Sequence, residues 1–367
     1  MTMGAVLQMS KRNAAIALGV LSLLYLVSTT YAALNGTHVW RQSDAFAQIM
    51  SFLGAKSMEP LQLFNQPATM FDTPIYEWLA ATLSRITSSD PLVSARLVND
   101  LFWCVFLLCG YRVTERIVSG AGLYFVFLAA TSPVFLQYFA APIPDGMALA
   151  LSIAAIDVMA TSVRALQLFS ASLLFIVAAL IKSPIPFVII VFFVVSTAVT
   201  ALSERGVRGL LRHWPMVIPL AAAMGATVAA EVIRKIVTHS TPAGEAANFT
   251  WYFGTGSTRL QQYYWQTMLD RATASFASPA LVAVVLLGLV VLLACAPHDF
   301  ARLVLPPAAG FFAGWLVFAN VFLLHDYYEM AVSALLMIGS ALALELLAQR
   351  ARAAIAVRGL GLNLSTT

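Results

Sequence analysis

Residues 38–50 read HVWRQSDAFAQIM and follow directly on the first long apolar run of the chain. This stretch places His38, Arg41 and Asp44 close together in a sequence in which only 10% of the residues are charged. Ionisable side chains at the edge of a membrane segment are rare and commonly functional. The segment that follows the first apolar run is therefore the first candidate for a functional site.

The composition around this stretch is typical of a helical membrane protein. Of 367 residues, 60% are hydrophobic, and the mean hydropathy is +0.83, whereas soluble domains contain about 45–50% apolar residues. The apolar residues occur in runs of about 20, which is the length of a membrane-spanning helix. The net charge of +4 does not indicate nucleic-acid binding, because the basic residues lie between apolar runs. The three cysteines lie inside apolar runs, so no disulfide framework is predicted.

The hydropathy pattern predicts an all-α polytopic protein with about ten transmembrane helices and a single membrane domain over residues 1–367. The predicted spans are 13–34, 92–111, 121–141, 145–163, 165–181, 184–202, 215–233, 279–296, 303–323 and 328–348. The first span is interpreted as a retained signal anchor. With the N-terminus in the cytoplasm, 12 of the 21 Lys and Arg residues fall in short cytoplasmic segments. This bias favours that orientation, with loops 35–91 and 234–278 on the non-cytoplasmic side.

The loop 35–91 is predicted to contain two interfacial helices. In the first, Ser43 caps a helix that begins at Asp44. Its apolar face consists of Phe46, Ile49, Met50 and Leu53. In the second, Thr73 is the cap and Pro74 is the first helical residue. Its mostly apolar face consists of Ile75, Leu79, Thr82, Leu83 and Ile86.

Asp44 is the first candidate for catalysis. In the first turn of a helix, its ionised form is favoured by the helix dipole and by the nearby Arg41. An ionised carboxylate held there could act as a general base on an acceptor hydroxyl or amine. The alternative is that Asp44 completes the helix cap and pairs with Arg41.

Other polar residues occur at the non-cytoplasmic ends of predicted spans. Asp145 lies in PIPDG (142–146) and is either a functional carboxylate or an ordinary helix start. Lys182 lies in LIKSPIP (180–186) and either binds a phosphate as a point charge or extends to the interface as an anchor. The stretch LLHDYYEM (323–330) interrupts an apolar region with four polar candidates. These candidates are His325, Asp326, Tyr327 and Tyr328.

The loop 234–278 carries the stretch NFTWYFGTGSTRLQQYYWQ (248–266), which includes Arg259 and several aromatic residues. This stretch could stack on a sugar or hold a lipid chain, although a plain interfacial aromatic belt is the simpler explanation. No two histidines have the spacing of metal ligands on a helix, and no nucleotide-binding motif is present. The sequence therefore predicts no cofactor, with a divalent metal left open.

Taken together, these motifs resemble the GT-C superfamily of glycosyltransferases, in particular the glycosyltransferase family 39-like branch of protein mannosyltransferases and aminoarabinose transferases of lipid A. The resemblance rests on HVWRQSDAFAQI, DTPIYEWLAA, SPVFLQYFAAPIPDGMALAL, LIKSPIPFVI and HDYYEMAV, which occur in the family's order. It implies a bundle of membrane helices with interfacial helices in the first non-cytoplasmic loop. It also implies that Asp44 matches the catalytic aspartate and that Lys182 lies near the donor phosphate. The second motif adds Asp72 and Tyr76 as candidates.

Two features depart from the family pattern. Many relatives carry paired acidic residues at the catalytic position, whereas Asp44 is followed by Ala45. Many also carry a soluble C-terminal domain, whereas this sequence ends about 20 residues after its last predicted span. Acceptor recognition is therefore the property that the resemblance predicts least directly.

The resemblance implies an inverting glycosyltransferase that moves a sugar from a polyprenyl-phosphate donor to a lipid, glycan or protein acceptor. The reaction would take place on the non-cytoplasmic face, in a bacterium the periplasmic side of the inner membrane. Asp44 would deprotonate the acceptor, and Arg41, Lys182 and Arg259 would bind the donor phosphate. The alternatives are a transporter or flippase of a lipid-linked saccharide, and a non-catalytic subunit of a glycan-assembly complex.

Overall fold

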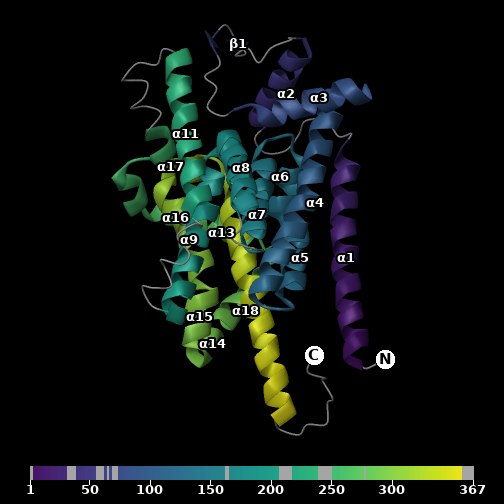
Figure 1. Ribbon diagram of the computed structural model, residues 1–367, viewed down its shortest axis with the longest axis vertical. Helices are drawn as coiled ribbons and strands as arrows, with labels where there is room; N and C mark the ends of the chain where they lie inside the picture. The colour runs from purple at the N-terminus through teal and green to yellow at the C-terminus, as the bar shows by residue number, and fades with distance from the viewer. Residues whose placement is uncertain are drawn as a thin grey trace.

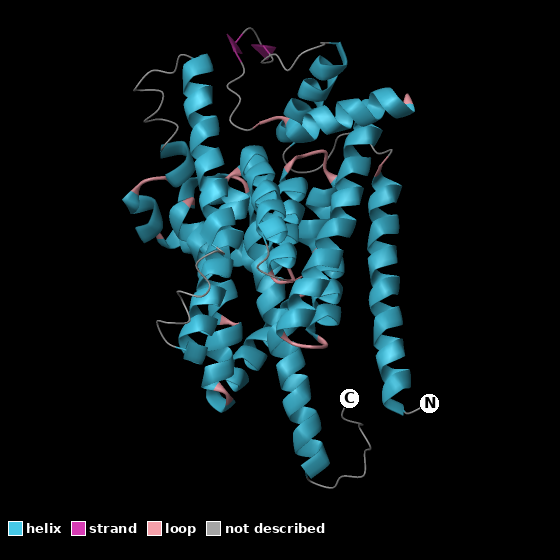
Figure 2. Cartoon of the chain, viewed as in Figure 1, coloured by secondary structure: helices cyan, strands magenta, loops and turns pink. Residues whose placement is uncertain are grey.

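The computed structural model describes residues 3–30, 39–54, 62–63, 66–67, 73–161, 165–205, 217–238, 250–276 and 278–357. Within these ranges the chain is a bundle of helices (Figures 1 and 2). The strands in this part of the chain are β1 (Gln62–Leu63) and β2 (Gln66–Pro67), which form one short antiparallel hairpin. The predicted all-α class is confirmed.

The helices follow the order of the predicted spans and loops. The first group consists of α1 (Met3–Thr29), α2 (Val39–Gly54), α3 (Ile75–Thr87), α4 (Pro91–Ile117), α5 (Ala121–Thr131), α6 (Pro133–Ala140) and α7 (Asp145–Met159). The second group consists of α8 (Ala165–Lys182), α9 (Pro184–Arg205) and α11 (Val217–Thr238). The third group consists of η2 (Gly256–Leu260), α13 (Gln262–Ala274), α14 (Pro279–Cys295), α15 (Pro297–Leu303), α16 (Leu305–Val317), α17 (Ala319–Leu324), η3 (Asp326–Tyr328) and α18 (Glu329–Val357).

The chain is an integral multi-pass membrane protein, but the predicted count of ten spans is not confirmed. Among the described residues, four helices are long and apolar enough to cross a membrane: α4, α8, α9 and α18 with the preceding η3. Two bent helix pairs, α5–α6 and α13–α14, raise the number to six. Two other predicted spans correspond to shorter helices, α7 with 15 residues and α16 with 13, whereas a straight crossing needs about 20.

Local sequence signals set several of these helix ends. The Asp90 carboxylate caps α4 by accepting hydrogen bonds from the backbone N–H of Leu92 (2.8 Å) and Val93 (3.2 Å). Pro133 interrupts the third predicted span, 121–141, and α5 and α6 meet there at an angle of 62°. Proline causes such a bend because it has no N–H to donate to the preceding turn.

Aromatic side chains fill the core between α4, α5 and α6. Trp103, Phe106, Phe135 and Phe139 are fully buried, and neighbouring ring centroids lie 4.9–5.7 Å apart. The indole N–H of Trp103 donates to the Ser22 hydroxyl (3.1 Å), which fastens α1 to the side of α4. This packing forms the support for the end of the bundle that carries α2 and α3.

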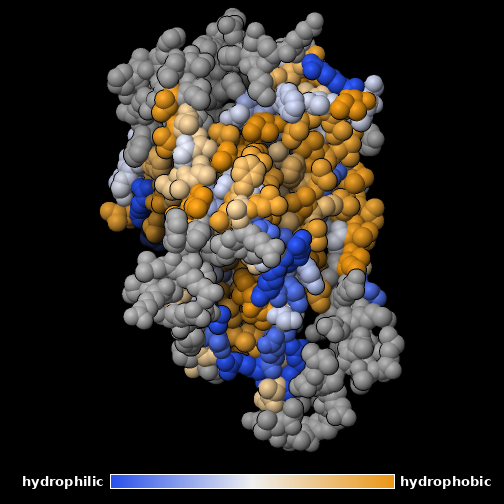
Figure 3. Space-filling model, in the orientation of Figure 1, coloured by the Kyte–Doolittle hydropathy of each residue, from blue (hydrophilic) through white to orange (hydrophobic). Residues whose placement is uncertain are grey.

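The two ends of the bundle carry different chain segments and different charged residues. In Figure 1 the two chain termini lie at one end, and α2, α3 and the hairpin lie at the opposite end. Figure 3 shows a largely hydrophobic surface on the face in view. Hydrophilic residues gather toward the end of the bundle that lies opposite α2 and α3. Arg112 and Arg116 pair there with Asp157, and Arg350 pairs with Asp299. The sequence placed these three arginines in the cytoplasm, so the structure gathers residues that were predicted to share a side.

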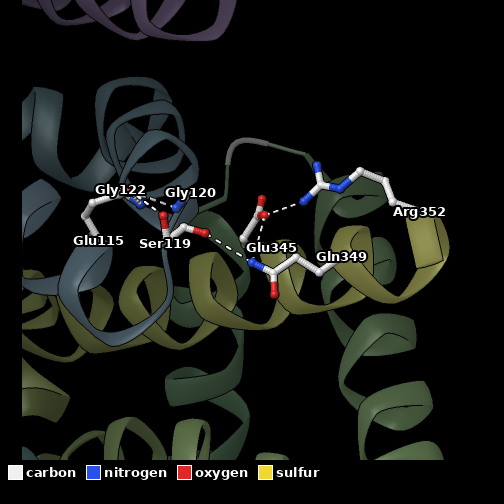
Figure 4. A network of polar contacts seen from close by, with 7 residues as sticks. All are labelled: Glu115, Ser119, Gly120, Gly122, Glu345, Gln349 and Arg352. Atoms are coloured by element: carbon white, nitrogen blue, oxygen red, sulfur yellow. Dashed lines mark hydrogen bonds and ion pairs between the residues drawn. The ribbon is translucent and has the colours of Figure 1, made fainter. Parts of the chain in front are cut away.

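A polar network closes this end of the bundle (Figure 4). The Glu115 carboxylate accepts hydrogen bonds from the backbone N–H of Gly120 (2.9 Å) and Gly122 (3.1 Å). On α18, the buried Glu345 accepts from Arg352 (2.6 Å) and from Gln349 (3.1 Å). Gln349 also donates to the Ser119 carbonyl (3.1 Å), so the α4–α5 turn is fixed to α18.

Gly120→Ala is expected to lower the free energy of unfolding by about 1–3 kcal/mol. Gly120 has φ +95°, which an L side chain rarely adopts, and an added Cβ would lie 2.8 Å from the Glu345 carboxyl carbon. The measurement is unfolding in detergent, with Gly225→Ala as the control because its Cβ would meet nothing within 4 Å. Equal stability of the two variants would contradict the expectation.

The first interfacial helix is confirmed, but its predicted start is wrong. The helix α2 begins at or before Val39, so Ser43 and Asp44 lie within it and Ser43 is exposed. Its buried side chains are Gln42, Ala45, Ile49 and Phe52, and the predicted Met50 is 47% exposed. The buried face lies against α3, whose Arg85 donates to the carbonyl of Leu53 (3.3 Å) near the end of α2.

The second interfacial helix is also present, but its predicted cap is wrong. The helix α3 begins at Ile75, and Thr73 does not cap it, because its start shows no side-chain cap hydrogen bond. Its buried residues are Tyr76, Glu77, Ala80, Ala81 and Ser84, whereas the predicted Ile86 is 77% exposed. Small and polar residues pack on protein at a membrane edge, and large apolar residues can face lipid. The sequence predicted an apolar face that lies on the membrane surface, and the exposure of Ile86 fits this prediction.

The orientation of the bundle is tested by single cysteines in a chain without native cysteines. Ser88→Cys, between α3 and α4, is expected to react with a membrane-impermeant thiol reagent added to intact cells. Thr161→Cys, beyond the end of α7, is expected to react only after the membrane is opened. Both positions are exposed. The reverse pattern of labelling would overturn the predicted orientation.

Candidate functional site

Lys182 is the last residue of α8, and its side chain is buried with only 4% exposed. Its ammonium lies 5.3 Å from the centre of the Tyr328 ring, which is the geometry of a cation–π contact. The backbone N–H of Thr73 donates to the Leu180 carbonyl (2.9 Å), which brings the start of α3 against the end of α8. An anchor that extends to the interface would be exposed, so burial argues against the simpler alternative for Lys182.

Tyr327 connects this lysine to residues from other helices. Lys182, Asp145 and Arg41 each lie within electrostatic range of the Tyr327 hydroxyl. The four residues come from α8, α7, α2 and η3, which are far apart in the sequence. We call Arg41, Asp145, Lys182, Tyr327 and Tyr328 the charged centre.

Asp145 is fully buried at the first position of α7. The turn before it is held by the Asn99 side chain, which donates to the carbonyls of Ala141 and Ile143. The Tyr76 hydroxyl is also within electrostatic range of Asp145 and donates to the Ala95 carbonyl (2.9 Å). Burial raises the pKa of Tyr76 well above its usual value, so this phenol stays protonated and serves as a hydrogen-bond donor.

Asp44 lies one turn after Arg41 on α2 and is only partly buried. Burial raises the pKa of the Asp44 carboxyl above 3.8, and the positive charge of Arg41 opposes this effect. The sequence predicted a lowered pKa from the first turn of a helix, which does not apply because the helix begins earlier. A raised pKa makes Asp44 a stronger base than a fully hydrated aspartate.

The remaining part of HDYY packs beside the charged centre. The ring of His325 stacks on Tyr327 with centroids 5.2 Å apart and an angle of 19°. The Tyr138 hydroxyl of α6 donates to the Asp326 carboxylate. Asp326 therefore receives a hydrogen bond that fixes the short helix η3 to α6.

Arg259 lies apart from these residues and has a different set of contacts. Its guanidinium donates to the carbonyls of Phe253 (2.7 Å), Thr255 (2.9 Å) and, near the end of α16, Leu316 (2.5 Å) and Val317 (3.0 Å). These contacts fasten the segment 253–259 to the end of α16. A phosphate-binding role for Arg259 stays a prediction, and its observed contacts are those of a structural residue.

Two of the sequence candidates, His38 and Asp72, lie outside the described residues. Among the residues that the structure describes, no group of three or more His, Cys, Asp and Glu is placed to hold a metal ion. The charged centre instead offers two cations and one carboxylate beside two phenols. This set is suited to binding an anionic group such as a phosphate, with a carboxylate close by.

Sequence reasoning missed Arg96 and Asp100, two buried ionisable residues of α4, whereas it had placed the buried Glu329 in the polar stretch 323–330. On α4, Arg96 donates to the Thr30 carbonyl (3.0 Å), and Asp100 accepts from the Thr30 hydroxyl (3.5 Å). Glu329 accepts from the indole N–H of Trp315 (3.4 Å). The spacing of Arg96 and Asp100, four residues apart in a predicted span, is the signal that could have found this pair.

Comparisons with known proteins identify the fold. No protein-family model matches the chain, and no curated protein sequence matches it. The structure is similar to that of ArnT from Cupriavidus metallidurans bound to undecaprenyl phosphate, with a TM-score of 0.64 and 14% identity. This match covers 94% of the chain and 61% of ArnT. The apo state of ArnT gives the same TM-score and identity over 92% of the chain and 60% of ArnT.

A second similar structure is the archaeal oligosaccharyltransferase AglB from Archaeoglobus fulgidus in complex with an inhibitory peptide and a dolichol-phosphate. The TM-score is 0.57 at 14% identity, over 97% of the chain and 53% of AglB. The chain thus spans between half and two thirds of the length of these proteins. Both are GT-C membrane glycosyltransferases, so the fold predicted from the sequence motifs is confirmed.

Proposed function

We propose that this chain, which has the GT-C fold of ArnT and AglB, is a membrane glycosyltransferase that uses a polyprenyl-phosphate sugar as its donor. The observation that carries the proposal is the burial of Lys182 beside Tyr328, with the charges of Arg41 and Asp145 near the same tyrosine pair. The compared structures contain undecaprenyl phosphate and dolichol-phosphate. A buried ammonium at the membrane edge matches a phosphate attached to a lipid chain.

The proposed reaction is a single displacement with inversion at the anomeric carbon. Asp44 takes the proton of an acceptor hydroxyl or amine as that group attacks the sugar. The bond between the anomeric carbon and the phosphate oxygen breaks, and the phosphate keeps the electron pair. Arg41 and Lys182 stabilise the negative charge that develops on the leaving phosphate. Asp145 is the second carboxylate of the site and would orient the acceptor from the opposite helix.

The proposal places the reaction on the non-cytoplasmic face, with a lipid, glycan or protein as the acceptor. The test uses membrane vesicles that contain the chain and undecaprenyl phosphate carrying a radiolabelled hexose or pentose. The expected result is movement of the label from the lipid donor into a second product, dependent on the chain. Label that crosses the vesicle membrane while still attached to the lipid would instead identify a flippase and contradict the proposal.

A further inference from the structure

A row of aromatic rings leads from the surface to Lys182. The Trp251 ring lies 5.6 Å from the His325 ring, and His325 stacks on Tyr327 at 5.2 Å. Tyr327 lies 4.8 Å from Tyr328, over which the Lys182 ammonium sits. We call Trp251, His325, Tyr327 and Tyr328 the aromatic row.

Exposure falls steeply along the aromatic row. Trp251 is 45% exposed, His325 is 8% exposed and Tyr327 is 2% exposed. The row therefore begins with an accessible indole and ends at the cation that the proposed function assigns to the donor phosphate. Tyr327 and Tyr328 are 2% and 3% exposed, so the accessible surface of the row is the Trp251 indole at its outer end.

The segment that carries Trp251 is held in place by polar contacts. The Asn320 side chain of α17 donates to the Trp251 carbonyl (2.8 Å). Arg259 donates to the Phe253 carbonyl (2.7 Å) and to the Val317 carbonyl (3.0 Å), which ties the same segment to α16. An indole of an interfacial belt needs no fixed position, whereas a binding surface benefits from one.

We propose that the exposed face of Trp251, together with His325, binds the ring of a saccharide next to the phosphate at Lys182. A sugar ring presents a face of C–H groups that packs on an aromatic ring, and its hydroxyls require polar partners such as an imidazole. This inference rests on the proposed function, since Lys182 defines where the saccharide begins. The saccharide is either the sugar of the donor or a sugar of the acceptor, and the two share the same chemistry.

The test measures affinities of the purified chain in lipid nanodiscs for three probes. The first is undecaprenyl phosphate, the second is undecaprenyl phosphate carrying mannose, glucose, galactose or arabinose, and the third is the set of methyl glycosides of these sugars. The variants are Trp251→Leu and Trp251→Phe. The matched control is Tyr263→Leu, since Tyr263 lies on α13 near the same segment and is 66% exposed.

Trp251→Leu is expected to leave the affinity for undecaprenyl phosphate unchanged and to weaken the binding of a saccharide-bearing probe by about five- to tenfold. Trp251→Phe should keep part of the affinity, and Tyr263→Leu should keep all of it. Weakening of the lipid-linked sugar assigns the row to the donor, and weakening of a methyl glycoside assigns it to the acceptor.

The inference is overturned if Trp251→Leu and Tyr263→Leu bind every saccharide probe as the wild type does. It is also overturned if the wild type binds undecaprenyl phosphate equally well with and without a sugar and binds no methyl glycoside. Failure of the wild type to bind undecaprenyl phosphate in any form contradicts the proposed function instead. The two failures are therefore distinguishable in one set of measurements.

Discussion

Asp44→Asn is expected to reduce sugar transfer by at least about 100-fold, the lower limit of what a positioned general base contributes. The amide keeps the size of the side chain but cannot accept the proton of the acceptor. Asp44 lies on α2 without a cap role, so the substitution should leave folding unchanged. The measurement is the rate of transfer from the polyprenyl-phosphate sugar, with thermal unfolding in detergent as the check on folding.

The control for Asp44 is Ser43→Ala, since Ser43 is the exposed neighbour on the same helix. This variant should transfer at the wild-type rate. Transfer by Asp44→Asn at the wild-type rate would remove Asp44 from the mechanism. It would also leave Asp145, buried near the Tyr327 hydroxyl, as the carboxylate to test next.

The pH dependence of kcat/KM provides a separate test of Asp44. Burial raises the pKa of this carboxyl above 3.8, and the base must be deprotonated to act. Activity is therefore expected to fall as the pH decreases through a pKa higher than that of a free aspartate. An activity that stays constant to well below pH 4 would contradict the base assignment.

Lys182→Gln is expected to weaken donor binding by about 10- to 150-fold, which corresponds to the loss of one charged hydrogen bond of about 1.5–3 kcal/mol. Lys182→Arg should keep part of the affinity, because the charge survives while a planar group replaces a compact ammonium. The measurement is the affinity of each form for undecaprenyl phosphate in nanodiscs.

The control for Lys182 is Arg271→Gln, which removes another positive charge of the membrane edge. Arg271 donates to the carbonyls of Phe322 and Leu323 and lies outside the charged centre. Its replacement should leave the affinity for undecaprenyl phosphate unchanged. Equal affinities of wild type, Lys182→Gln and Lys182→Arg would mean that Lys182 does not bind the phosphate and that Arg41 must be tested in its place.

The sequence was sufficient to predict the fold class. The apolar runs predicted helices, and the motifs around Asp145, Lys182 and Tyr327 predicted one shared site region. The structure brings these three residues together from α7, α8 and η3. The sequence can predict which of these residues share a side, because the ends of successive helices alternate between the two sides of a membrane.

Other features could not be read from one sequence. The start of α2 depends on packing against α3, so the apparent cap at Ser43 was misleading. The contacts of Arg259 depend on carbonyls near the end of α16, which a linear pattern does not reveal. The face of α3 that packs on the protein was not predicted, because it consists of small and polar residues such as Ala80 and Ser84.

The most direct test of the central claim is an experimental structure of the chain in a nanodisc with undecaprenyl phosphate. The account predicts density for the phosphate within about 3 Å of the Lys182 ammonium, with Arg41 on the same group and Asp44 facing the position of the sugar. A phosphate bound elsewhere on the bundle, away from the Lys182 ammonium, would contradict it.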